Sequence, residues 1–63
     1  MNKLKFLRQR KGITQEKLAV VSGLSIQQIK KMETNDFNFH SCKIETLEKV
    51  AVVFKVSINY FLY

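Results

Sequence analysis

Apolar residues recur every three or four positions along most of the chain, which is the spacing of one face of an α-helix. The first such segment covers residues 2–11, where Leu4 and Leu7 lie one turn apart. Gly12 follows at the position where helices commonly end in a left-handed glycine. These features predict a first helix that ends at Lys11.

Two further helices are predicted between residues 14 and 34, and a polar cap marks the start of each. Thr14 provides an N-cap whose first turn contains Glu16, and Gly23 ends that helix. Ser25 caps the next helix, which we expect over residues 26–34. The two helices are therefore joined by a very short turn.

The second half of the chain contains the longest connection and two more predicted helices. Residues 35–43 are rich in polar residues and contain two phenylalanines, which we expect to point into the protein. A helix is predicted from the spacing of the apolar residues that follow, Ile44, Leu47, Val50, Ala51 and Phe54. Ser57 is expected to cap a short last helix over residues 58–62. The predicted fold is all-α, a compact five-helix bundle without strands.

The composition excludes several classes of protein. A chain of 63 residues without proline or internal repeats provides one domain, residues 1–63, and no linker. Cys42 is the only cysteine, so an intrachain disulfide is excluded and a reducing compartment is favoured. The sequence has no signal-peptide pattern and no apolar stretch of the roughly 18 residues that a membrane span requires. We therefore expect a soluble cytoplasmic protein.

The net positive charge of the chain is confined to its first half. Residues 1–33 contain eight basic and two acidic residues, whereas residues 34–63 contain three of each. The whole net charge of +6 thus lies on the first half. A one-sided basic surface that binds a polyanion would produce this asymmetry, and so would an ordinary solvated surface.

A specific constellation joins the second and third predicted helices. Ala19 is small enough to allow two helices to cross closely, and Gly23 permits a left-handed backbone in the short turn. Ile29 and Met32 lie three apart and fill the angle between the helices. The combination is much more specific than any one of these residues, and it predicts a helix-turn-helix from Gln15 to Glu33, with an ordinary helical hairpin as the alternative.

Nearly the whole chain is similar to the lambda-repressor and Cro type of helix-turn-helix, the XRE family. The similarity rests on residues 4–8, on residues 12–19 and on later matches at Leu24-Ser25, Ile29, Met32-Glu33, residues 44–47, Val50-Ala51 and residues 56–58. The resemblance implies a five-helix domain whose third helix enters the major groove of DNA, with its N-terminal residues against base edges. It also implies that Gln15 holds a phosphate and that Arg8 and Glu33 form a structural ion pair.

The sequence departs from the family pattern at two helix ends and in one loop. Asn35 and Lys55 stand where the family usually has glycine, and the loop before Ile44 is about three residues longer than usual. A non-glycine residue in the left-handed conformation costs roughly 1 kcal/mol. We therefore expect both helix ends to be shaped differently here.

The outward face of the third helix supplies the predicted base contacts. With Ile29 and Met32 facing inward, a rotation of about 100° per residue turns the remaining side chains toward solvent. Glutamine can pair with adenine, lysine can donate to guanine, and isoleucine can pack on a thymine methyl group. The predicted base-contacting residues are Ile26, Gln27, Gln28, Lys30 and Lys31, although a solvated face remains the alternative for the two lysines.

Phosphate contacts are predicted on the first two helices and at the start of the third. Besides Gln15, the candidates are polar or basic residues of the first half, Arg10, Lys11, Lys17 and Ser25. A lysine on a first helix is also commonly exposed without contacting DNA, and this is the alternative for Lys3 and Lys5. These contacts position a protein on DNA without reading its sequence.

No enzymatic or metal chemistry is predicted. His40 and Cys42 lie two residues apart, but two ligands fall short of the three or four that a zinc site uses. The sequence also shows no nucleophile that could pair with a histidine and an acid. It has no glycine-rich phosphate loop either. We expect neither a metal nor a cofactor.

Two functions remain open from the sequence. One is a sequence-specific regulator, a repressor that binds a palindromic operator on double-stranded DNA, as small bacterial or phage-encoded regulators do. The other is an interaction protein such as an antitoxin, because Val20, Val21 and Val52 replace residues that are usually polar in the family, and exposed apolar patches mark partner sites. A homodimer is predicted through the neutral half of the chain, at Val52, Tyr60 and Tyr63.

Overall fold

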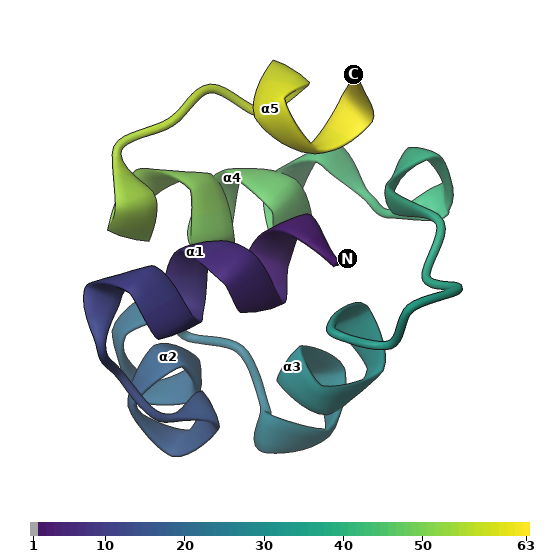
Figure 1. Cartoon of the computed structure of the whole chain (residues 1–63). Coiled ribbons are helices and arrows are strands. Elements are labelled where there is room, and N and C mark those ends of the chain that lie inside the picture. The colour runs from purple at the N-terminus through teal and green to yellow at the C-terminus, as the bar shows by residue number, and fades with distance from the viewer. Residues whose placement is uncertain (1) are drawn as a thin grey trace.

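The computed structural model describes residues 2–63, and within this range the chain forms five α-helices and no strand. They are α1 (Lys3–Lys11), α2 (Gln15–Ser22), α3 (Ile26–Met32), α4 (Ile44–Phe54) and α5 (Asn59–Leu62). A short 3-10 helix, η1 (Phe39–Ser41), lies in the long connection between α3 and α4. Figure 1 shows α2 and α3 in the lower half of the molecule, α5 at the top, and α1 and α4 between them. The predicted all-α fold is confirmed.

The first three helices begin and end largely where the sequence predicted. The side chain of Asn2 caps α1, which begins one residue later than expected. Thr14 and Ser25 each accept a hydrogen bond from the backbone N–H three residues ahead, and Gly12 and Gly23 adopt left-handed conformations with φ of 76° and 77°. Because these caps are local, the sequence alone locates them.

The helix α3 is shorter than predicted, because its end is capped from another helix. It ends at Met32 rather than Thr34, and the side-chain amide of Asn2 donates to the carbonyl oxygens of both Met32 (2.8 Å) and Thr34 (2.9 Å). Asn35 has no positive φ. The expected departure from a glycine-type ending is therefore confirmed at this end.

The helix α4 keeps the left-handed ending without a glycine, so the expectation of a different shape is wrong there. Lys55 has a φ of 56° and is the one non-glycine residue with positive φ between residues 2 and 63. Its N–H bonds to the carbonyls of Ala51 and Val52 and satisfies the end of the helix. The chain thus accepts local strain to terminate α4.

This strain predicts that Lys55→Gly will stabilise the fold by about 0.5–1 kcal/mol, since glycine adopts the left-handed conformation freely. The midpoint of urea denaturation measures the effect. Lys49→Gly is the matched control, because Lys49 is also exposed but lies inside α4, where glycine should cost a similar amount. A lower midpoint for Lys55→Gly would contradict the assignment of strain.

The predicted N-cap of the last helix is wrong. The helix α5 begins at Asn59, and Ile58, with helical φ and ψ of −61° and −26°, occupies the cap position without a side-chain hydrogen bond. Ser57 contributes its carbonyl oxygen, which accepts from the N–H of Tyr60 at 3.1 Å. Packing holds this short helix in place, because Phe61 is buried and its ring centre lies 5.2 Å from that of Phe39.

The core is formed by apolar side chains from every helix and from η1. Its fully buried members are Leu4, Leu18, Ile29, Leu47 and Val50. The two phenylalanines of the long loop point inward as predicted, since Phe39 is buried and Phe37 packs edge-on against it at 4.9 Å. The helix α2 packs against both α3 and α4, so the core fixes the position of α3.

Candidate nucleic-acid interface

The helices α2 and α3 are joined by a turn of three residues, Gly23 to Ser25. Ala19 is buried on α2, and Ile29 and Met32 are buried on α3. The close crossing of two short helices through a small residue and a left-handed glycine is the geometry of a helix-turn-helix. The opposite face of α3 is left exposed to solvent.

The exposed face of α3 carries three of the predicted base-contacting residues, Gln27, Lys30 and Lys31. The other two differ from them. Ile26 is half-buried and packs against the core, so only part of its side chain is accessible. Gln28 is exposed, but its Oε1 accepts hydrogen bonds from the N–H and the hydroxyl of Ser25 at 3.1 and 3.3 Å.

The Gln28 contacts form a capping box with Ser25, whose hydroxyl oxygen accepts from the N–H of Gln28 at 3.1 Å. Bidentate pairing with adenine needs both the oxygen and the nitrogen of a glutamine amide, so Gln28 would have to leave the box to read a base in this way. Gln27 takes no part in the capping box, so it is the better candidate for bidentate pairing with adenine. The signal was present in the sequence, since a serine followed three residues later by glutamine is typical of a capping box.

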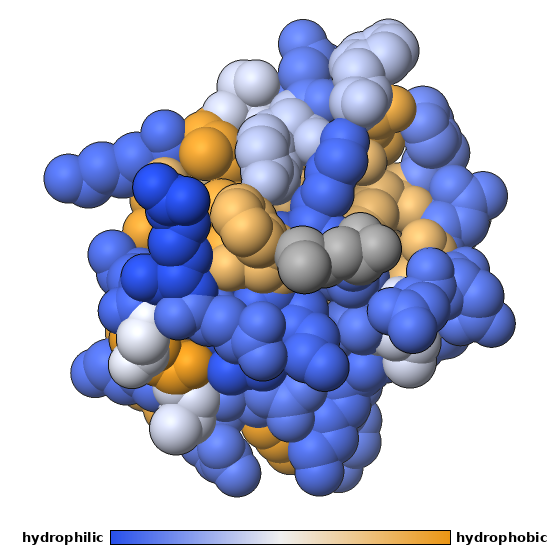
Figure 2. All heavy atoms as spheres, viewed as in Figure 1, coloured by the Kyte–Doolittle hydropathy of each residue, from blue (hydrophilic) through white to orange (hydrophobic). Residues whose placement is uncertain are grey.

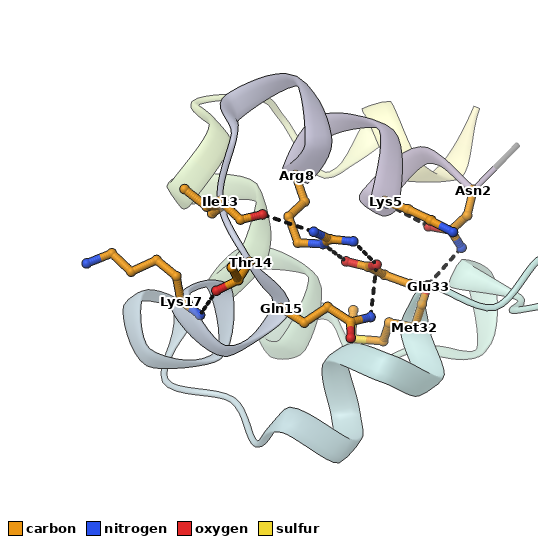
Figure 3. Close-up of polar contacts among 9 residues, drawn as sticks. All are labelled: Asn2, Lys5, Arg8, Ile13, Thr14, Gln15, Lys17, Met32 and Glu33. Atoms are coloured by element: carbon orange, nitrogen blue, oxygen red, sulfur yellow. Dashed lines mark hydrogen bonds and ion pairs between the residues drawn. The ribbon is translucent and has the colours of Figure 1, made fainter.

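The Arg8–Glu33 pair lies at the junction of α1, α2 and the end of α3. Arg8 binds Glu33 through two hydrogen bonds, Nε to Oε2 at 2.6 Å and Nη2 to Oε1 at 2.9 Å, and its Nη1 donates to the carbonyl of Ile13 at 2.9 Å (Figure 3). The side chains are 13% and 3% exposed. The hydrogen bond to Glu33 raises the pKa of Arg8 despite partial burial, so the guanidinium stays charged.

Gln15 is bound to this pair rather than pointing freely toward solvent. Its Nε2 donates to Oε1 of Glu33 at 3.1 Å, and Figure 3 shows its amide beneath the carboxylate. One amide N–H remains for another acceptor, since an amide nitrogen has two. No local pattern predicted this contact, because Gln15 and Glu33 are 18 residues apart.

The remaining predicted phosphate contacts, Lys17, Arg10, Lys11 and Ser25, have different surroundings. Lys17 is exposed, and its side chain points away from the Arg8–Glu33 pair in Figure 3. Arg10 and Lys11 are exposed in the last turn of α1, where positive charge also favours the helix end, and Arg10 lies over the ring of Phe6 at 5.9 Å. The hydroxyl of Ser25 is used in the capping box.

Comparison with family models decides the class of the protein. A family model described as helix-turn-helix matches residues 4–61, which is most of the chain. The chain belongs to this helix-turn-helix family. The family is of the lambda-repressor type and consists of DNA-binding regulators, as the resemblance predicted. No protein of curated function and no solved structure matches the chain.

The helix-turn-helix match agrees with the hydrophilic surface of the region that contains α2 and α3. Figure 2 shows hydrophilic side chains over most of the lower half of the view, where α2 and α3 lie, with small hydrophobic patches among them. The first half of the chain, which carries the whole net charge, forms α1, α2 and α3. The excess of basic over acidic residues therefore lies in the part of the fold that contains the helix-turn-helix.

The residues considered for metal binding have other neighbours. The Nε2 of His40 lies 2.9 Å from the carbonyl oxygen of Leu62, and partial burial raises the pKa of the Cys42 thiol. Among residues 2–63, no three His, Cys, Asp or Glu side chains gather where a metal ion would be held. None of the described helices has the length and hydrophobicity needed to cross a membrane.

The three residues of the predicted dimer interface have different surroundings. Val52 is 72% exposed on α4, and Tyr63 is 90% exposed beside His40 at 6.4 Å between ring centres. Tyr60 is half-buried, and the ammonium of Lys3 lies 5.6 Å from its ring centre and donates to its carbonyl oxygen at 3.0 Å. Tyr60 thus contributes part of its side chain to the packing of α5 against the core.

Proposed function

We propose that this helix-turn-helix protein is a sequence-specific transcription regulator, a repressor that occupies a palindromic operator on double-stranded DNA as a homodimer. The exposed face of α3 supports this most directly, because Gln27, Lys30 and Lys31 lie together opposite the buried Ile29 and Met32. Side chains that donate and accept hydrogen bonds at such positions read base edges in the major groove. Two copies about one helical turn apart, near 34 Å, would read both half-sites.

Selection from random duplex DNA tests the proposal. The protein is incubated with a randomised library, and bound duplexes are sequenced over several rounds. Recovery of one motif with two-fold symmetry is the expected result. Weak binding without any enriched motif would overturn the proposal, because base readout by α3 would then be absent.

We expect Gln27→Ala and Lys31→Ala each to lower preference for the selected motif by about 1–3 kcal/mol, since each removes a base contact. Binding to unrelated DNA should change much less. Gln15→Ala should instead weaken all sequences alike, because a phosphate contact carries no sequence information. Competition gel shifts with selected and unrelated duplexes measure both quantities, and a change of base preference from Gln15→Ala alone would contradict the proposed orientation of α3.

A second function is favoured by exposed valines. Val20 and Val21 on α2 are 76% and 46% exposed, and Val52 on α4 is 72% exposed. Such side chains suit an interaction protein, for example an antitoxin, in which DNA binding is secondary. Polar replacements at Val20 and Val21 distinguish the two, because the regulator should keep its motif and its repression while an antitoxin would lose its partner.

A further inference from the structure

A hollow of about 250 Å³ lies between α3 and the long connection that follows it. Its apolar wall consists of Met32 from α3 and of Phe37 and Cys42 from the connection. Met32 is 3% exposed, whereas Phe37 and Cys42 are half-buried. In Figure 1 the connection leaves the end of α3 and runs along the right side of the view to the start of α4. The hollow thus depends on a segment in which this chain departs from the pattern of its family.

The polar side chains of the hollow supply hydrogen-bond donors. Gln28 uses its Oε1 in the capping box, so the two N–H groups of its Nε2 remain available. Lys31 adds an ammonium group from α3, and Thr46 adds a hydroxyl from the first turns of α4. The Ser41 hydroxyl also lines the hollow, but it donates to a backbone carbonyl at 2.8 Å. Three side chains of the hollow therefore offer donors to a ligand.

The charge of the hollow is positive. Lys31 supplies it, and none of the described residues that line the hollow is acidic. Within residues 2–63 the one ion pair is that of Arg8 and Glu33, so Lys31 has no ion-pair partner in the described chain. An ammonium group beside two neutral donors favours a carboxylate, because charge-assisted hydrogen bonds are the strong ones. The apolar wall favours a ligand whose remaining atoms are apolar.

We propose that this hollow binds a small aromatic carboxylic acid in its ionised form. The carboxylate accepts hydrogen bonds from Lys31, Gln28 and Thr46, and the ring packs against Met32 and Phe37. A volume of about 250 Å³ lies below the roughly 300–1,000 Å³ of sites for drug-sized molecules, so the ligand has one or two rings. A phosphate group of DNA would satisfy the same donors, but it would leave the apolar wall in water.

Binding in the hollow affects α3, because Lys31 belongs both to the hollow and to the predicted base contacts. An ammonium group that is held by the carboxylate of the ligand is not free to donate to guanine. The bound acid also places a negative charge beside a surface proposed to face DNA phosphates. The ligand therefore acts as an inducer that weakens operator binding. This consequence rests on the proposed function, whereas binding of the acid does not.

Phenylacetate is the probe, and two measurements on the full chain follow its binding. Titration from about 10 µM to about 10 mM, monitored by the amide chemical shifts of isotope-labelled protein, gives the dissociation constant. The shifts should be largest at residues 28–32, 37–42 and 46. The reaction of Cys42 with iodoacetamide gives the second readout, because Cys42 is the one cysteine of the chain and lines the hollow. A saturating probe should slow this reaction about fivefold by covering the thiol.

Substitutions of the donors test their roles. Lys31→Met should weaken binding of phenylacetate about tenfold and Thr46→Val about threefold, because each removes a donor and nearly keeps the shape of the side chain. Lys30→Met is the matched control, since Lys30 is also an exposed lysine of α3 but does not line the hollow, and it should bind the probe like wild type. Phenylacetamide, the neutral analogue, should bind wild type about tenfold more weakly. Thermal melting confirms that each variant is folded.

The absence of shifts and of thiol protection up to about 10 mM would overturn the proposal, as would shifts centred outside the hollow or equal affinities of Lys31→Met and wild type. Inorganic phosphate that shifts the same resonances at the same concentrations would also overturn it and assign the hollow to a phosphate of DNA.

Gel shifts test the inducer role separately. With saturating phenylacetate, affinity for the selected motif should fall about tenfold for wild type and stay unchanged for Lys31→Met, which lacks the shared ammonium group. Unchanged affinity of wild type with the probe bound would refute the inducer role alone. Failure to select any motif would refute the proposed function, while binding of phenylacetate, measured without DNA, would still support the site.

Discussion

Arg8→Ala is expected to destabilise the fold by about 3–5 kcal/mol, because it leaves the carboxylate of Glu33 buried without its cation. The Glu33 side chain is 3% exposed and receives two hydrogen bonds from Arg8. A domain of this size rarely has more than about 3–5 kcal/mol of stability. We therefore expect the variant to be largely unfolded at 25 °C by circular dichroism and urea denaturation.

Two further variants make the Arg8 prediction specific. Lys5→Ala changes an exposed cation on the same helix and should alter stability by less than about 0.5 kcal/mol. Arg8→Met combined with Glu33→Gln removes both charges and should recover at least about 1 kcal/mol relative to Arg8→Ala, since no charge is then buried alone. Equal denaturation midpoints for Arg8→Ala and Lys5→Ala would refute the structural role of the pair.

Asn2→Ala is expected to destabilise the protein by about 2–3 kcal/mol, although Asn2 lies on no predicted functional surface. Asn2 is 6% exposed, and its side chain makes three hydrogen bonds. Its oxygen accepts from the N–H of Lys5 at 3.0 Å, and its amide donates to the carbonyls of Met32 and Thr34. The substitution removes the N-cap of α1 and leaves the end of α3 without its donor.

The expected loss is divided between the two helix ends, and Asn2→Ser separates them. Serine keeps an N-cap oxygen but is too short to replace the amide, so Asn2→Ser should be more stable than Asn2→Ala and less stable than wild type. Hydrogen exchange should show reduced protection at the end of α3 in both variants. Unchanged protection there would contradict the proposed link between the ends of α1 and α3.

The starts and ends of the helices show which helix boundaries are determined by short-range interactions. Thr14 and Ser25 bond to backbone groups three residues ahead, and Gly12 and Gly23 supply left-handed turns, so these boundaries were predictable. The end of α3 and the start of α5 were not. They depend on Asn2, 30 residues from Met32, and on the burial of Phe61 against η1.

The candidate interface likewise has features that the local sequence predicted and features that it did not. The helical period placed Ile29 and Met32 inside and Gln27, Lys30 and Lys31 outside, because periodicity depends on backbone geometry alone. Periodicity carries no information on side-chain hydrogen bonds. The engagement of Gln15 with Glu33 joins residues far apart in sequence, while the capping box of Gln28 is a local pattern that the outward direction of its side chain obscured.

The sequence by itself determined the all-α class and the helix-turn-helix, because these follow from the spacing of apolar residues and from caps that act over three or four positions. It also determined the family, through the similarity of nearly the whole chain to that family. Only the tertiary structure decided how α3 ends and what Gln15 and Asn2 bind. Each of these depends on chain segments that meet only after folding. Long-range hydrogen bonds and grooves have no local sequence pattern, so the packed molecule alone reveals them.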